Sequence, residues 1–580
     1  MFKVSIVTPA NLSHPGLAVA GARAGASIFF DIELCRESNL PQVKANLTKT
    51  LKSIAESAIV GLRFHPDQAA YCRSLLEELS ARSHTLLLAG WDVSSSARTA
   101  ASLPPSDKRD WYLEVTDTSQ IESLDQAGVR LAGVVAKGHE CGGWVSESSS
   151  FILVQQLLAK STHSVHVQGG IGPNTAAACR AAGAAGVVLD DQLWVMPESP
   201  FPQEWKDTLK NLNGSETVVC GERLGRPLRV LSRPGFTAAE KLRRLSEEAE
   251  MEDNAQKWHE NAQSLIGWSD PSLAAWPVGQ MVGMAASLAK RYRTTGRLVR
   301  AIRAEVESSV RHAAALESLA PEAPLARSHG TRYPIVQGPM TRVSDVAPFA
   351  LAVAKAGGLP MLALALMRGP QVKGLLCECK SLMGGLSWGI GILGFVPPDL
   401  REEQLAVVRE VRPPFAIIAG GRAEHAAELE NEGIATYLHV PTPQLLELFV
   451  GRGSRRFIFE GRECGGHVGP LSSFCLWESM IEKLLAVPEK VAPEIHVSSK
   501  QIHDGWQFEI KDNGIGIEEK DKEKIFIMFQ RLNNKNEYAG TGIGLTHCKK
   551  ITELHNGNIW VESRPGHSSS FYFTILTDKL

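Results

Sequence analysis

Apolar runs alternate with amphipathic or alanine-rich stretches through the first 205 residues. Stretches such as Gln68–Ala81 and Thr175–Ala182 have helical spacing, and the continuous apolar runs between them are typical of strands buried on both faces. The expected strands are Val4–Thr8, Ser27–Ile32, Ala58–Phe64, Thr85–Trp91, Trp111–Val115, Leu131–Ala136, Ser164–Gln168 and Gly186–Leu189. Eight strands separated by helices predict a closed (β/α)8 barrel, with a flavodoxin-like open sheet as the alternative.

A second series of the same kind starts at Tyr333 and stops after about six units. Its later strands are expected at Leu359 onward, Leu386–Leu393, Phe415–Ala419, Ala435–Val440 and Phe457–Glu460. The helical run Leu476–Leu485 is followed by no seventh or eighth unit of this type. The sequence therefore predicts a second (β/α)8-type barrel that is truncated, with two unpaired edges and an open core.

The rest of the chain has a different character. Residues 206–328 are mostly helical and end in linker-like sequence at Pro321–Pro324 and Ser328–Gly330. After residue 488, four β-rich runs and glycine-rich turns predict a small α+β sandwich fragment; the runs are Ile495–Ser499, Trp506–Ile510, Asn558–Ser563 and Ser570–Ile575. We expect four domains: a barrel at 1–205, a helical extension and linker at 206–328, a truncated barrel at 329–487 and the fragment at 488–580.

One short motif occurs in both barrels. GHECGGW at 138–144 and GRECGGH at 461–467 each follow a short apolar strand, and both continue into Ser-Ser-Phe. The two copies are offset by 323 positions, which indicates a duplicated domain. Glycines after a strand let the backbone pass close to a flat ligand, and His467 in the second copy can exchange a proton near neutral pH. The alternative for His467 is a loop histidine bonded to a backbone carbonyl.

A second glycine turn, Gly169-Gly170-Ile171-Gly172, follows the seventh strand of the first barrel. Backbone N–H groups and the start of a following helix favour an anion, so this turn suits a phosphate. Glycines also serve simple tight turns, which is the alternative.

Composition excludes several classes of function. The chain has 580 residues with a formal net charge of −2, 44% hydrophobic and 21% charged residues, so no overall basic field attracts nucleic acid or a membrane surface. Its apolar runs are too short to span a bilayer. Ten scattered cysteines without zinc spacing predict structural thiols, no metal site and a cytoplasmic location.

The order strand–GxECGG, helix, strand–GGIG, helix, strand resembles the nitronate monooxygenase family (formerly 2-nitropropane dioxygenases) and the related FMN-dependent enoyl reductases of polyketide and polyunsaturated fatty-acid synthases. The opening YPIVQGPM at 333–340 and the AGG turn at 356–358 resemble the same family. The resemblance implies FMN as cofactor, a nitronate or an enoyl or acyl thioester as substrate, and His467 as the acid or base. It assigns the cofactor to Gln337, Gly338, Pro339, Met340, Gly357, Gly358, Glu463, Gly465, Gly466, Glu140, Gly142, Gly143, Gly169 and Gly170.

The first copy departs from that family. Trp144 replaces the histidine, Thr8-Pro9-Ala10 replaces the usual opening turn, and Asp190-Asp191 follows the eighth strand where a phosphate would need N–H donors. Two like charges about 5 Å apart repel by about 3 kcal/mol at an effective dielectric constant of about 20. We therefore expect no catalysis by this copy, with His139 as a polar loop residue.

The C-terminal fragment resembles the ATP-binding domain of histidine kinases, in wording closest to phytochrome-type sensor kinases. DNGIG at 512–516 and GTGIGL at 540–545 resemble its glycine boxes. The resemblance implies ATP binding by Asp512, Gly514, Gly516, Gly540, Thr541, Gly542, Gly544 and Leu545. The phosphoacceptor helix and the Mg²⁺-binding asparagine helix have no counterpart, so we expect no phosphotransfer.

Three functions remain open. The first is an FMN-dependent oxidoreductase, alone or as a piece of a larger synthase whose modules it contacts. The second is a catalytically degenerate flavin-barrel scaffold. The third is an ATP-binding signalling protein, which depends on Asp512–Leu545 alone.

Overall fold

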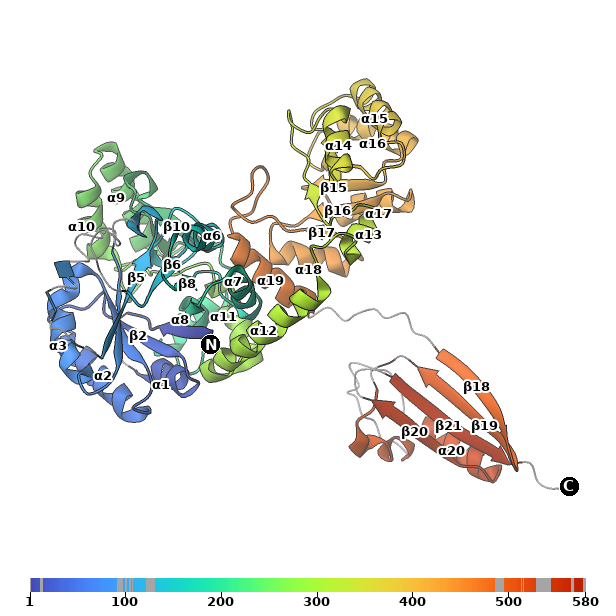
Figure 1. Cartoon of the computed structure of the whole chain (residues 1–580), viewed down its shortest axis with the longest axis horizontal. Helices are drawn as coiled ribbons and strands as arrows, with labels where there is room; N and C mark the ends of the chain where they lie inside the picture. Colours follow the sequence, from blue (N-terminus) through green and yellow to red (C-terminus); the bar gives the residue numbers. More distant parts are fainter. Residues whose placement is uncertain are drawn as a thin grey trace. The chain divides into compact units, whose positions relative to one another are not determined.

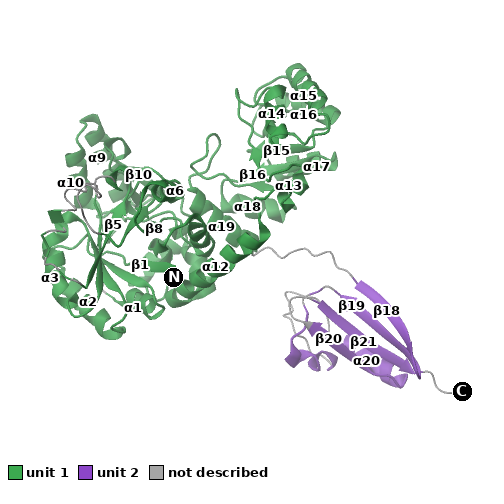
Figure 2. Cartoon of the chain, viewed as in Figure 1, with its two compact units in different colours: residues 1–485 green, residues 486–580 purple. Residues whose placement is uncertain are grey.

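The structure is a computed structural model that describes residues 2–10, 14–90, 98–99, 102–103, 106, 108–121, 131–485, 495–512, 514, 516–527, 544–564 and 568–576. The chain divides into two compact units, residues 1–485 and 486–580 (Figure 2). The boundaries of the four predicted domains stay predictions.

The N-terminal part of the first unit is a closed parallel barrel (Figure 1). Its strand order is β1 (Lys3–Val7), β2 (Ser27–Asp31), β3 (Val60–Phe64), β4 (His84–Leu88), β5 (Arg109–Val115), β6 (Gly133–Lys137), β8 (Val165–Gln168) and β9 (Gly186–Leu189). β9 pairs with β1 and closes the barrel. The predicted (β/α)8 fold is confirmed, and the open-sheet alternative is wrong.

Helices surround this barrel and bury the outer face of its strands. They are α1 (Gly16–Arg23), α2 (Leu40–Ser53), α3 (Ala69–Leu79), α6 (Ser150–Lys160) and α7 (Pro173–Ala182). Every residue of β3, β4, β6, β8 and β9 is buried, because the barrel interior covers one face and the helices cover the other. This explains the continuous apolar runs in the sequence.

The middle part of the helical extension covers the carboxyl end of the barrel, while its last helix packs outside against α1 and α7. The extension contains α8 (Gln203–Lys210), α9 (Thr237–Met251), α10 (Ala255–Leu265), α11 (Val282–Tyr292) and α12 (Thr295–Leu316). Its strands β10 (Thr217–Cys220) and β11 (Leu228–Leu231) form a small antiparallel sheet with β7 (Gly143–Trp144), which is part of the first GxECGG copy. The extension thus takes two residues of the motif into its own sheet.

The second barrel is open. Its six parallel strands follow the order β12 (Val336–Gln337), β13 (Leu359–Ala363), β14 (Gly389–Leu393), β15 (Phe415–Ala419), β16 (Ala435–His439) and β17 (Phe457–Ile458). The helices are α14 (Ala347–Lys355), α15 (Gly369–Met383), α16 (Pro398–Val411), α17 (Ala423–Asn431), α18 (Pro443–Gly451) and α19 (Ser473–Leu485). The predicted truncated barrel is confirmed as a half-barrel with edge strands β12 and β17.

The predicted linker before this half-barrel is partly helical. α13 (Pro324–His329) ends in a buried histidine whose Nε2 lies 2.7 Å from the Tyr437 hydroxyl, and its ring packs edge-on against Phe415 at 5.4 Å. Phe415 is the first residue of β15 and Tyr437 is the third of the five residues of β16, so α13 packs against these two strands in their amino-terminal halves. The linker interpretation missed this because six residues carry too little periodicity.

The C-terminal unit is a four-stranded antiparallel sheet in the order β18 (Ile495–Ile502), β19 (Gly505–Asp512), β21 (Ser568–Leu576) and β20 (Ile559–Arg564). α20 (Gly544–Leu554) packs on β20 and β21. The predicted α+β fragment is confirmed. In the part of the chain that the structure describes, no helix is long and apolar enough to span a membrane.

Candidate functional site

Both GxECGG copies form the same local bond. Glu140 accepts from the backbone N–H of Ser150 at 3.2 Å, and Glu463 accepts from that of Ser473 at 2.9 Å. Ser150 and Ser473 begin α6 and α19, whose first N–H groups lack a partner within the helix. The glutamate of each motif is therefore fixed as a helix cap.

The two copies also contact each other at equivalent positions. The Arg462 guanidinium bonds to His139 Nε2, and the rings of Phe151 and Phe474 lie 5.5 Å apart. Both pairs are 323 residues apart, the offset of the duplication. Self-contact between equivalent residues is the mark of a two-fold axis, so the repeats are related by a pseudo-two-fold axis at this interface.

In the first barrel, the extension fills the surface that a flat ligand would use. A Cβ at Gly142 would collide with the Pro277 carbonyl, and Gly143 pairs with Arg229 in the small sheet. Trp144 is buried against Trp258 at 6.1 Å. The position that carries His467 in the second copy is thus part of a hydrophobic core here.

The predicted phosphate turn is filled by α19. Glu478 accepts from the Thr175 N–H at 2.8 Å, the Thr175 hydroxyl at 3.1 Å and the Asn174 side-chain amide at 3.0 Å. A Cβ at Gly170 or Gly172 would meet Phe474 or Glu478. Glu478 is fully buried, and burial raises its pKa. A carboxylate of the second repeat therefore lies at the α7 N-terminus, where the phosphate is expected.

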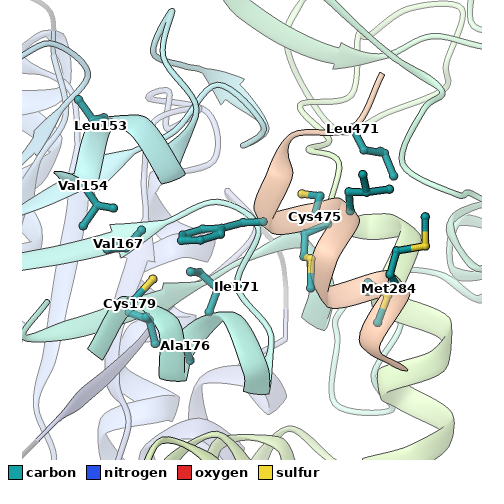
Figure 3. Packing of buried hydrophobic residues seen from close by; sticks show 14 of the residues in the cluster. Leu153, Val154, Val167, Ile171, Ala176, Cys179, Met284, Leu471 and Cys475 are labelled. Atoms are coloured by element: carbon teal, nitrogen blue, oxygen red, sulfur yellow. The ribbon is translucent and has the colours of Figure 1, made fainter. Parts of the chain in front are cut away.

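The apolar residues beside that carboxylate continue the core of the first barrel. Leu471 and Cys475 belong to the same buried hydrophobic cluster as Ile171 of the glycine turn and Met284 of α11 (Figure 3). Gln280 joins the same contact: its side chain donates to the Pro470 carbonyl at 2.8 Å and accepts from the Ser472 N–H at 2.9 Å. α19 is thereby integrated into the first barrel.

The interior of the barrel mouth carries a buried charge cluster. Arg63 donates to Asp31 at 2.9 Å and to Glu114 at 2.7 Å, and Lys137 donates to Glu114 at 3.1 Å. Burial raises the pKa of Asp31 to about 6; Glu114 is buried too, but Arg63 and Lys137 lower its pKa to about 2. The charged groups of this cluster form ion pairs with one another and not with a ligand.

The cavity above this cluster has a volume of about 50 Å³ and is lined by Thr8, Lys137, Gln168, Asp190, Trp194 and their neighbours. Since one water needs about 10–15 Å³, the cavity holds a few waters and no tricyclic ring. At its edge, burial and the adjacent Asp190 raise the pKa of Asp191 well above its usual range. The first barrel does not fit a flavin, because protein covers its ring site and its phosphate turn and the remaining cavity is too small.

The second copy is open where the first is filled. Gly465 and Gly466 are exposed, and a Cβ at either would meet nothing within 4 Å. Gly466 has a φ of +96°, which favours glycine. The His467 ring lies 5.1 Å from that of Phe395, at the carboxyl end of the sheet. This surface has room for a flat ring beside an imidazole.

The other predicted residues of the second copy divide between the two ends of the sheet. Gln337 ends β12, and its side chain pairs with the Met361 backbone at 3.3–3.4 Å, which positions the turn Gly338-Pro339-Met340 at the carboxyl end. Gly357 and Gly358 precede β13 and so lie at the amino end. There Gly357 has a φ of +96° and packs against Tyr333. The structure does not bring Gly357 and Gly358 to His467.

Two residues near His467 were missed by the sequence analysis. His439 ends β16 and Glu460 follows β17, and His439 Nε2 lies 3.3 Å from Glu460 Oε2. His439 is 6% exposed. A signal was available, since both stand at strand ends on the carboxyl side of the half-barrel.

In the C-terminal unit, Asp512 ends β19 and accepts from the Gly514 N–H at 2.8 Å. Gly516 has a φ of +70°, and Gly544 and Leu545 begin α20. Gly540, Thr541 and Gly542 lie outside the described residues. Among the residues described, no group of three His, Cys, Asp or Glu side chains could hold a metal ion.

Comparison with known proteins identifies the C-terminal segment. Residues 482–579 match the family profile described as histidine kinase-, DNA gyrase B- and HSP90-like ATPase. Over 100 residues the chain is 46% identical to cyanobacterial phytochrome A of Nostoc sp., a match that covers 17% of this chain and 13% of the relative. The match covers between 9% and 20% of the length of these curated relatives.

Solved structures similar to the remainder include two enzymes. FabK from Thermotoga maritima is 20% identical with a TM-score of 0.43, and covers 54% of this chain and 96% of its own. Nitroalkane oxidase from Streptomyces ansochromogenes is 19% identical with a TM-score of 0.38, and covers 54% of this chain and 98% of its own. Because these TM-scores are low, the barrel assignment depends on its own strand pairing. The chain therefore combines a (β/α)8 barrel and a half-barrel with a domain of the histidine-kinase ATPase type.

Proposed function

We propose that the chain is a flavin-dependent oxidoreductase of the nitronate monooxygenase and enoyl reductase type, in which the second copy of the motif carries the chemistry. The observation that supports this most is the open surface at Gly465 and Gly466 beside His467. The first barrel is its structural support, because its equivalent surface is filled. A contact with other modules of a polyketide or fatty-acid synthase belongs to the same proposal.

The residues of the second copy fit the ring part of FMN. Gly465 and Gly466 leave its face unobstructed, and Gln337 positions the adjoining turn. When bound, the flavin would exchange a hydride or electron with the substrate carbon. His467 would take the proton from a nitronate or acyl substrate, or deliver it to an enoyl product, through an imidazole nitrogen.

The phosphate part of FMN has no matching turn within the described residues 329–485. The turn of the first barrel holds Glu478 instead. Without such a turn, we expect the phosphate of FMN to add less than about 0.7 kcal/mol to binding. FMN and riboflavin, which differ by this phosphate, should then bind the second copy with affinities within about threefold of each other.

The test is the visible spectrum of the purified full chain titrated with FMN and with riboflavin. The proposal expects flavin bands that bleach with a nicotinamide donor and return with oxygen. His467→Ala should abolish turnover while the bands remain. A colourless chain that binds neither flavin contradicts the proposal, and so does full turnover by His467→Ala.

A second candidate function, nucleotide binding by the C-terminal unit, is favoured by the family match to residues 482–579. Asp512 would accept a hydrogen bond from the adenine amino group, since its carboxylate oxygens act only as acceptors. Equilibrium dialysis with ATP tests this: Asp512→Asn should weaken binding at least tenfold. If the wild-type chain and Asp512→Asn retain ATP equally, Asp512 does not contribute to the nucleotide site.

A further inference from the structure

One carboxylate at the mouth of the first barrel lies outside the buried charge cluster. Asp190 follows β9, is 8% exposed and lines the cavity of about 50 Å³ above that cluster. It accepts a hydrogen bond from the Gln168 side-chain amide at 2.8 Å. Among the described residues, no lysine, arginine or histidine forms an ion pair with it. Asp190 is thus a buried carboxylate beside a cavity, and a buried charge without a counterion is unfavourable.

The charges around this cavity do not cancel. The buried charge cluster has two cations and three carboxylates, which are Arg63, Lys137, Asp31, Glu33 and Glu114. Even if a protonated His65, with its Nε2 3.2 Å from Glu33, balances the third carboxylate, Asp190 adds one negative charge. Its neighbour Asp191 adds none, since burial and Asp190 raise the pKa of Asp191 well above its usual range. The cavity therefore attracts a cation.

A neutral acceptor beside Asp190 also lacks a partner. Gln168 ends β8, is 3% exposed and lines the same cavity. Its Nε2 donates to Asp190, while its Oε1 is buried and accepts no hydrogen bond. The amide cannot be reversed, because its oxygen would then face the Asp190 carboxylate. The carboxylate and the carbonyl oxygen accept hydrogen bonds and donate none, so both require a donor from the cavity.

Two indole rings line the same cavity. Trp194 and Trp268 pack edge to face with their ring centroids 4.9 Å apart, and among the described residues neither indole N–H has an acceptor. A cation within about 6 Å of an indole centroid is attracted to the ring, and an oxygen on the same ligand would accept from an indole N–H. No group of three His, Cys, Asp or Glu side chains in the described part of the chain could hold a metal ion. The lining therefore suits an organic ammonium group rather than a metal.

The cavity admits only a small head group. Since one water needs about 10–15 Å³, its volume of about 50 Å³ holds about four atoms of that size. A second cavity of about 180 Å³ shares Glu33, Leu34 and Ile266 with it, so a longer ligand can extend there. An amine on a short polar chain fits this space.

We propose that the mouth of the first barrel binds a small amine, whose ammonium group donates hydrogen bonds to Asp190 and to Gln168 Oε1 and lies against the two indole rings. The segments that exclude a flavin from this barrel leave room for a ligand of this size. The site takes no part in the proposed oxidation or reduction at the second copy, so its test does not depend on the proposed function.

The first arm of the test is isothermal titration calorimetry of the purified full chain near neutral pH with ethanolamine, ethylene glycol and glycolate. These probes have nearly the same size, and only ethanolamine is a cation. The proposal expects ethanolamine to bind saturably and at least about tenfold more tightly than the other two, because hydrogen bonds from an ionised donor are stronger. Weaker discrimination, or no saturable binding of ethanolamine, overturns the proposal.

The second arm locates the site. Asp190→Asn keeps the shape of the side chain but removes its charge, and should weaken ethanolamine binding at least about tenfold. The control is Asp207→Asn, because Asp207 pairs with Lys210 on the exposed surface of α8, and this variant should bind ethanolamine like the wild-type chain. Equal affinity of Asp190→Asn and the wild-type chain overturns the proposal.

The third arm needs no variant at Asp190 and decides the matter if Asp190→Asn fails to fold. In the ¹⁵N-labelled wild-type chain, the indole N–H signals of Trp194 and Trp268, assigned with Trp194→Phe and Trp268→Phe, should shift along one saturation curve as ethanolamine is added. The signal of Trp560, in β20 of the C-terminal unit, should stay in place. If neither Trp194 nor Trp268 responds, ethanolamine does not enter the cavity and the proposal is wrong.

Discussion

The two GxECGG copies have the same sequence core, the same strand before them and the same glutamate-to-serine helix cap, yet their surfaces differ. The first copy is covered by the extension, which pairs Gly143-Trp144 in its own sheet, and by α19, which places Glu478 at the phosphate turn. The second copy has neither cover within the described residues. The GxECGG motif that the two repeats share therefore does not by itself make a binding site. The segments packed against the motif decide whether a ligand has room.

The largest expected effect is on catalysis. His467→Trp places in the second copy the residue that the first copy carries, and should reduce turnover about 10²–10⁴-fold because it removes the general acid or base. Adding Trp144→His to this variant should restore nothing, since position 144 is buried against Trp258. Steady-state rates with a nitronate and an enoyl thioester check both statements. Restored activity in the double variant would show that the first barrel can also serve as a site.

A matched pair of glycine substitutions tests the difference in cover directly. Gly142→Ala drives a Cβ into the backbone of Pro277 and Gly279, neither of which can move aside, and should destabilise the first unit by roughly 1–3 kcal/mol. Gly465→Ala meets open space and should change stability by less than about 0.5 kcal/mol. Urea unfolding followed by tryptophan fluorescence compares the two. Equal losses would mean that the two surfaces are covered alike.

The next largest expected effect on stability comes from the contact of Glu478 with the N-terminus of α7. Glu478→Ala leaves the N–H groups of Asn174 and Thr175 without their acceptor and should cost about 1–3 kcal/mol. The control is Gln155→Ala, the exposed equivalent on α6, which should be nearly neutral. Phosphate should raise the Tm of Glu478→Ala more than chloride at equal ionic strength. No difference between the two salts contradicts the idea that the carboxylate occupies an anion site.

The contact between His139 and Arg462 at the pseudo-two-fold axis predicts a smaller effect on stability, and this effect depends on pH. Burial and the cationic Arg229 and Arg462 lower the pKa of His139 to about 3, against about 6.5 for an unfolded chain. The unfolded state therefore takes up the proton first, and stability falls as pH falls from about 6.5 toward 3, by at most about 1.4 kcal/mol per pH unit. His139→Gln should flatten this slope. Parallel unfolding curves for the two proteins between pH 7 and pH 5 would contradict it.

Much of the fold could be predicted because parallel strands covered on both faces produce apolar runs that no other element of that length produces. The eight strands of the barrel and the six of the half-barrel were found in this way. The C-terminal strands pair antiparallel, and they were found instead from β-rich runs bounded by glycine-rich turns. α13 was missed because it is short, and the pair His439 and Glu460 was missed because its only signal was the strand-end position, with no motif to add to it.

The sequence by itself determined the duplication, the strand order of each repeat and the position of His467 after a glycine turn, because these follow from local pattern and from chain order. Only the tertiary structure decided that Glu478 occupies the turn at Gly170–Gly172, that the extension covers Trp144, and that Gly357 and Gly358 lie at the far end of the sheet. The reason is physical: whether a glycine faces a ligand, a carboxylate or open space depends on segments hundreds of residues away, and no local pattern records what they cover.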